Sequence, residues 1–111
     1  MMNDKFVFNN ETELSDLGGG VKRKVLAYSE DMMQVEVHFE QGSIGSEHRH
    51  PHTPTTYVLC GEFEFTVDGE TGTVKQGDMV YMPANSLHGC RCIKDGILLD
   101  SFTPYREDFV K

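Results

Sequence analysis

The sequence lacks a long apolar run and has few basic residues. Its longest apolar segments, such as residues 57–60, are far too short to cross a bilayer. Ten Lys and Arg residues stand against 18 Asp and Glu residues, which gives a formal net charge of −8. A chain this acidic repels phosphate backbones and anionic lipid headgroups. We therefore expect neither a nucleic acid nor a membrane as a partner.

Cysteine is also scarce, and no secretory leader is visible. The chain has three Cys residues, an odd number that argues against a disulfide framework. Its first residues show no basic stretch followed by an apolar run, so we expect a cytoplasmic protein. A length of 111 residues suits one domain, which we place at residues 1–111. Because a core this small gains stability from association, we expect a homodimer.

Helical periodicity is scarce, and alternation of apolar and polar residues replaces it. Residues 35–39 alternate with period two, which favours a strand over a helix. Further strand patterns lie at residues 57–60, 62–67, 79–82 and 97–102. Glycine-containing turn signals separate them at residues 18–20, 41–42, 68–69, 76–78 and 95–96. This pattern predicts an all-β sandwich or closed barrel.

Four of the five histidines form two groups that can converge. His48, His50 and His52 are spaced by two residues, so in an extended segment their imidazoles point to one side. His88 follows another predicted strand and offers a distant partner. Imidazole nitrogen binds Zn, Ni, Cu and Fe well, which makes a metal site a candidate. His38 alternates with apolar neighbours and is expected on the outer face of its strand.

The spacing of seven residues resembles the two motifs of the cupin family. The matching residues are Gly42, His48, His50 and Gly61 in the first motif and Gly77, Pro83 and His88 in the second. The motifs thus span about residues 42–61 and 77–92. Asn85 replaces a motif glycine but tolerates the same left-handed backbone, and Cys92 replaces a final asparagine. The resemblance implies a single-domain cupin, a double-stranded β-helix or jelly-roll barrel. It also implies a divalent transition metal (Ni, Zn, Fe or Mn) at His48, His50 and His88.

One departure from the cupin pattern concerns the fourth metal ligand. The position that carries Glu or Gln in cupins is Pro54 here, and a proline side chain cannot bind a metal. His52 faces the same way as the other two histidines of its segment and is a substitute ligand. Thr53 or Thr55 could at most hold a water molecule. Loss of the metal altogether is the competing interpretation.

Several longer segments, most of them outside the general cupin motifs, resemble the small cupins of pectin degradation. The similar segments are residues 17–26, 48–52, 61–65 and 98–109. The resemblance implies conversion of 4,5-unsaturated monouronates, released by pectate or alginate lyases, into open-chain keto sugars. It also implies three catalytic residues at matching spacing, Asp100, Phe102 and Arg106.

Chemistry supports these three roles without the resemblance. The Arg106 guanidinium can bind the substrate carboxylate through two hydrogen bonds. The Asp100 carboxylate can move the proton as an enol becomes a ketone, and Phe102 can form an apolar wall. Each residue also has a structural interpretation: a turn aspartate, a solvated ion-pair arginine and a core phenylalanine. Arg49, Arg91 and Arg106 are expected to offset the acidic charge near a pocket.

Two other functions stay open at this point. One is a cupin that binds a small sugar acid or organic acid without catalysis, which Pro54 favours. The other is an Fe(II)-dependent dioxygenase, because three histidines leave coordination positions open for oxygen. The cysteines, Cys60, Cys90 and Cys92, are expected as small buried side chains rather than metal ligands.

Overall fold

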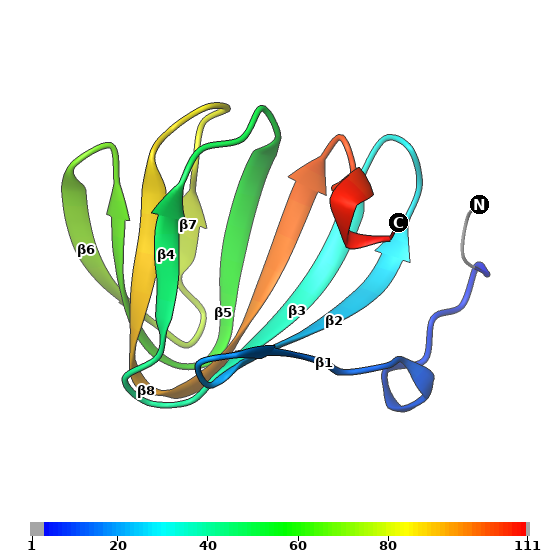
Figure 1. Cartoon of the computed structure of the whole chain (residues 1–111), viewed down its shortest axis with the longest axis horizontal. Coiled ribbons are helices and arrows are strands. Elements are labelled where there is room, and N and C mark those ends of the chain that lie inside the picture. Colours follow the sequence, from blue (N-terminus) through cyan, green and yellow to red (C-terminus); the bar gives the residue numbers. More distant parts are fainter. Residues whose placement is uncertain (1–3, 111) are drawn as a thin grey trace.

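The computed structural model describes residues 4–110, and most of its regular structure is β-strand (Figure 1). The strands are β1 (Ser15–Gly18), β2 (Val21–Tyr28), β3 (Met33–Phe39), β4 (Ile44–His48), β5 (Thr53–Val67), β6 (Glu70–Lys75), β7 (Met79–Tyr81) and β8 (His88–Thr103). Two 3-10 turns, η1 (Asn9–Glu11) and η2 (Glu107–Phe109), flank them. The all-β prediction is confirmed. Within residues 4–110, neither helical turn has the length or apolar character that a bilayer crossing requires.

Two long strands, β5 and β8, connect the layers of the fold. They pair with each other along most of their length, and every strand pair is antiparallel. The first part of β8 pairs with β4, and its last part pairs with β3. In the same way, β7 pairs with the first part of β5 and β6 with the second. Because both long strands bend, the sheet folds into two facing layers and forms the jelly-roll barrel of Figure 1.

The place where β5 and β8 bend past each other contains two glycines. Gly61 has a φ of +86°, and a Cβ on it would lie 2.5 Å from the carbonyl oxygen of Asp95. A Cβ on Gly96 would lie 2.5 Å from the carbonyl oxygen of Cys60. The prediction of a turn at residues 95–96 is therefore wrong, because Gly96 is buried inside β8. Glycine at this position permits close backbone approach rather than chain reversal.

The apolar core lies between the two layers. Inward-facing residues of β3 alternate with polar ones, as residues 35–39 predicted. His38 faces away from the core and its Nε2 lies 2.9 Å from Oε1 of Glu36, which confirms its outer location. The buried apolar side chains are Met33, Val35, Val37, Phe39, Val58, Phe63, Phe65, Met82, Cys92, Leu98 and Phe102. Cys92 is fully buried as expected, whereas Cys60 and Cys90 are only partly buried.

One end of the barrel gathers the ends of several strands. Figure 1 shows that β4 ends there, and that β8 both begins and ends there because it bends at the opposite end. The turn η2 lies beside the last residues of β8 at the same end. Residues that are far apart in the sequence, such as His48 and Asp100, can therefore face a common space.

Candidate functional site

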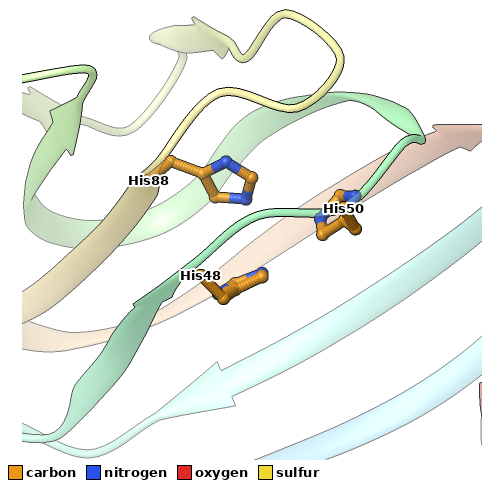
Figure 2. A group of neighbouring side chains, drawn as sticks. All are labelled: His48, His50 and His88. Carbon is orange, nitrogen blue, oxygen red and sulfur yellow. The ribbon is translucent and has the colours of Figure 1, made fainter.

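Three of the predicted histidines converge at this end of the barrel. His48 ends β4 and is the register partner of His88, the first residue of β8, while His50 lies two residues beyond His48. One ring nitrogen from each of the three lies within 4.8 Å of the other two. Figure 2 shows the three rings turned toward one space between the end of β4 and the start of β8. The predicted convergence of His48, His50 and His88 is confirmed.

Backbone contacts leave ring nitrogens of these histidines available. Nδ1 of His48 lies 2.7 Å from the carbonyl oxygen of Ser46, and Nδ1 of His88 lies 3.2 Å from that of Ser86. Each Nδ1–H therefore donates to a carbonyl, which orients the ring and leaves Nε2 with its lone pair. Both ring nitrogens of His50 are buried without a hydrogen-bond partner among the described residues. Because an unpaired buried nitrogen costs free energy, this arrangement fits a ligand.

The protonation states of His50 and His88 also suit metal binding. Burial, assisted by the charge of Arg106 and by the neighbouring imidazoles, lowers the pKa of His50 to about 4. Burial and the charge of His48 lower the pKa of His88 as well. Neutral imidazole is the form that binds a metal. The three residues therefore fit a divalent transition metal, and an all-nitrogen donor set suits Zn, Ni, Cu or Fe(II).

The fourth ligand position differs from the cupin pattern in the structure as well. Pro54 is fully buried and lines the same cavity as the three histidines, where it offers no donor atom. His52 lies beside His50, with ring centroids 5.3 Å apart. Its Nε2 is 3.1 Å from the carbonyl oxygen of Tyr105, and it does not belong to the close group of ring nitrogens. A ligand role for His52 stays a prediction.

A cavity of about 150 Å³ joins the histidines to the predicted catalytic residues. Asp100, Phe102 and Arg106 all line it, although they come from the last part of β8 and the segment after it. The other lining residues are mostly apolar and include Phe39, Phe65, Met82 and Leu98. The cavity therefore combines a nitrogen-rich end, one carboxylate, one guanidinium and an apolar wall.

The Asp100 carboxylate is held by a residue that the sequence did not single out. Thr56, its register partner on β5, donates a hydrogen bond from Oγ1 to Oδ1 of Asp100 at 2.6 Å. Burial raises the pKa of Asp100 to about 6, and the Thr56 hydrogen bond and the charges of His48 and Arg106 partly oppose the rise. A carboxyl group with such a pKa can give or take a proton near neutral pH. Thr56 shares a strand face with Pro54, which is the signal that could have identified it.

Only one of the three arginines expected near the pocket lines the cavity. The Arg106 guanidinium lies 5.5 Å from the centroid of the Phe102 ring. Arg49 instead donates from Nη1 to the carbonyl oxygen of Asn85 at 2.9 Å, and Arg91 is exposed beside Glu64. Arg49 and Arg91 therefore do not line the cavity, whereas Arg106 does. Strand alternation turns Arg91 outward.

The backbone between Pro83 and His88 joins the two histidine segments. Asn85 has a φ of +64°, which confirms that asparagine takes the left-handed conformation of the replaced glycine. Its N–H donates to the carbonyl oxygen of His50 at 2.9 Å. With the Arg49 contact, this hydrogen bond fixes the segment after β4 against the segment before β8, and so positions His50 near His88.

Comparison with known proteins agrees with this architecture. Residues 35–100 match the Cupin domain family. The chain is 39% identical over 108 residues to the pectin degradation protein KdgF of Dickeya dadantii, covering 96% of this chain and 98% of that protein. The solved structure of KdgF from Halomonas sp. has a TM-score of 0.92 at 33% identity, over 96% of this chain and 99% of that chain. An RmlC-like cupin from Shewanella frigidimarina has a TM-score of 0.95 at 40% identity, over 97% of each chain.

The chain belongs to the cupin family, and its barrel brings together three histidines that could hold a metal ion. Within that family it is similar to KdgF proteins from two organisms along nearly its whole length.

Proposed function

We propose that this protein converts 4,5-unsaturated monouronates from pectin or alginate breakdown into linear keto sugars. The observation that carries the proposal is one cavity lined by His48, His50, His88, Asp100 and Arg106. It offers a metal-binding group, a proton-transfer group and a carboxylate-binding cation together. Similarity to KdgF, a protein named for pectin degradation, supports this class of substrate.

The reaction is an isomerisation, so no oxidant or reductant is needed. The substrate is a cyclic hemiacetal whose double bond joins C4 to C5, beside the carboxylate. Ring opening breaks the C1–O5 bond. The C1 hydroxyl loses its proton as C1 becomes an aldehyde, and O5 gains a proton to give an enol at C5. The enol becomes a ketone when C4 gains a proton and the enol oxygen loses one. Groups that orient the ring and move these protons suffice for catalysis.

Each cavity residue has a place in this scheme. Arg106 binds the carboxylate, because a planar guanidinium matches both carboxylate oxygens. Asp100 moves the proton between the enol oxygen and C4, and Phe102 packs against the ring as an apolar wall. A divalent transition metal at His48, His50 and His88 would polarise sugar oxygens as a Lewis acid. The small cavity fits one sugar ring rather than an oligosaccharide, since sites for larger ligands span roughly 300–1,000 Å³.

The test follows the loss of the substrate's ultraviolet absorbance when the double bond disappears. Unsaturated galacturonate and unsaturated mannuronate are each compared with their uncatalysed rate, with and without a chelator. We expect acceleration that the chelator removes, and a loss of at least 100-fold in Asp100→Ala and Arg106→Ala, the range of general acid–base and binding groups. Arg91→Ala, an exposed arginine outside the cavity, is the control and should retain full activity.

A second candidate function is non-catalytic binding of a sugar acid, which the buried Pro54 at the fourth ligand position favours. The result that favours it is folded, metal-loaded protein that binds galacturonate without accelerating the conversion of unsaturated galacturonate or unsaturated mannuronate. That result would support this function and contradict the proposed enzymatic activity. Consumption of oxygen with Fe(II) would instead indicate a dioxygenase.

The single domain over residues 1–111, the homodimer and the cytoplasmic location stay predictions. Phe6 and Phe8, which are 78% and 58% exposed in the segment before β1, support association with another copy of the chain.

A further inference from the structure

The turn η2 places a carboxylate directly against Arg106. Nε of Arg106 donates to Oδ1 of Asp108 at 3.0 Å, and Nη2 donates to Oδ2 at 2.8 Å. This is a bidentate pair, which fixes both the position and the plane of a guanidinium. The Arg106 side chain is only 15% exposed, whereas that of Asp108 is 61% exposed. Asp108 therefore approaches from the solvent side and holds a guanidinium that is largely enclosed.

The same contact leaves part of the guanidinium available. A guanidinium carries five N–H groups, and Asp108 takes one on Nε and one on Nη2. Three N–H groups remain, two on Nη1 and one on Nη2. One N–H of Nη1 and the second N–H of Nη2 form the other edge of the group, which can donate two hydrogen bonds to a carboxylate. Arg106 lines the cavity, so this edge can serve a ligand there.

Two aromatic rings also contact the Arg106 guanidinium. The guanidinium carbon lies 4.4 Å from the ring centroid of Phe109 and 5.5 Å from that of Phe102. The two rings meet edge to face, with centroids 5.8 Å apart. Contacts of this kind attract a cation to the ring face. Asp108 and Phe109 thus hold the guanidinium from neighbouring positions of one short turn.

A second arginine lies close to the Phe109 ring, so the charge of Asp108 acts on two guanidinium groups. The Arg23 guanidinium carbon lies 3.9 Å from the centroid of the Phe109 ring, so both arginines contact the same ring. Burial and the charge of Arg106 lower the pKa of Arg23, whereas the charge of Asp108 raises it. Without the carboxylate, two like charges would repel across Phe109. Asp108 compensates that repulsion and keeps Arg106 in place.

We propose that Asp108 is a positioning residue, which holds Arg106 so that its second edge receives the carboxylate of a sugar acid. The inference rests on the proposed role of Arg106 and extends it to the segment after β8. It predicts that Asp108 determines selectivity for a carboxylated sugar over its neutral counterpart. In a different role, the substrate carboxylate would displace Asp108 from Arg106. Asp108 would then compete with the substrate, and its replacement would tighten galacturonate binding.

The test compares Asp108→Asn with the wild type, using Glu70→Gln as the control. Glu70 is exposed in the β6 strand, and its replacement removes the same unit of charge. In Asp108→Asn we expect KM for unsaturated galacturonate to rise about tenfold while kcat stays within about twofold, because an interaction used for binding is weakened. Calorimetry on the zinc-loaded protein should show about tenfold weaker binding of galacturonate and unchanged binding of galactose. Asp108→Glu should recover part of the loss, and Glu70→Gln should match the wild type.

The outcomes separate this inference from the proposed function. If the wild type binds galacturonate more tightly than galactose but has no turnover, only the proposed enzymatic activity is contradicted. The comparison of binding affinities then still decides the role of Asp108. Tighter galacturonate binding in Asp108→Asn would make Asp108 a competitor and overturn the inference. An unchanged affinity overturns it too, as does equal weakening for both sugars, which indicates a general structural role. Wild type that does not distinguish the two sugars also overturns it.

Discussion

Replacing Asp100 with Asn should stabilise the metal-free protein at neutral pH. The carboxyl group lines the barrel cavity, and its burial raises its pKa to about 6 from the usual 3.8. The folded state therefore binds this proton more tightly than the unfolded chain does. The contribution of Asp100 to the free energy of unfolding is therefore highest below pH 3.8, falls as the pH rises from about 4 to about 6, and stays low above that range.

The size of the effect follows from the pKa shift. A rise of roughly two units corresponds to about 3 kcal/mol of lost stability once the group is ionised. Asn has nearly the same shape as Asp, and its Oδ1 can accept the 2.6 Å hydrogen bond from Thr56. We therefore expect Asp100→Asn to exceed the wild type by about 1–3 kcal/mol at pH 7.5 and to equal it at pH 4.

Urea unfolding of chelator-treated protein at both pH values measures this difference. Asp31→Asn is the matched control, because Asp31 is exposed and its loss changes the net charge equally. Zinc should reduce the gain, since a cation at the three histidines favours an ionised carboxylate in the same cavity. A variant less stable than the wild type at pH 7.5, or equally stabilised at both pH values, would refute the reasoning.

Two further predictions concern the metal and the strand crossing. His50→Ala should abolish zinc binding measured by calorimetry, and with it the stabilisation of about 2.7 kcal/mol expected at a zinc concentration 100 times Kd. His38→Ala, on the outer face, should retain zinc binding and the stabilisation by zinc. Equal zinc binding by the two variants would contradict the location of the metal site. Gly61→Ala should lose several kcal/mol in denaturant unfolding, because its Cβ would lie 2.5 Å from backbone. Gly72→Ala, with open space around the Cβ, should change stability by less than about 1 kcal/mol. Similar losses at both positions would show that β5 and β8 are not tightly packed where they cross.

The sequence predicted the barrel and the histidine group well, because strand alternation indicates the first and the spacing of the two motifs indicates the second. Alternation of side chains along a strand identified the inward residues of β3 and the common face of His48 and His50. It failed at Gly96, because a glycine required by a neighbouring strand has the same local pattern as a turn glycine. Contacts between distant segments were out of reach where no motif marked them, unlike the contact of His48 with His88. The hydrogen bond from Thr56 to Asp100 depends on the register of β5 against β8, which no single segment encodes.

The bend of β8 has a consequence for how the site can vary. His88 opens this strand and Asp100 lies in its last part, so one continuous strand supplies both ends of the cavity. Insertion of one residue between them would turn Asp100 and Phe102 to the outer face while leaving His88 in place. The proposed metal binding and the proposed proton transfer can therefore be uncoupled by a change of length alone. Related barrels could keep the histidines and change their chemistry by changing which residues of this one strand face the cavity.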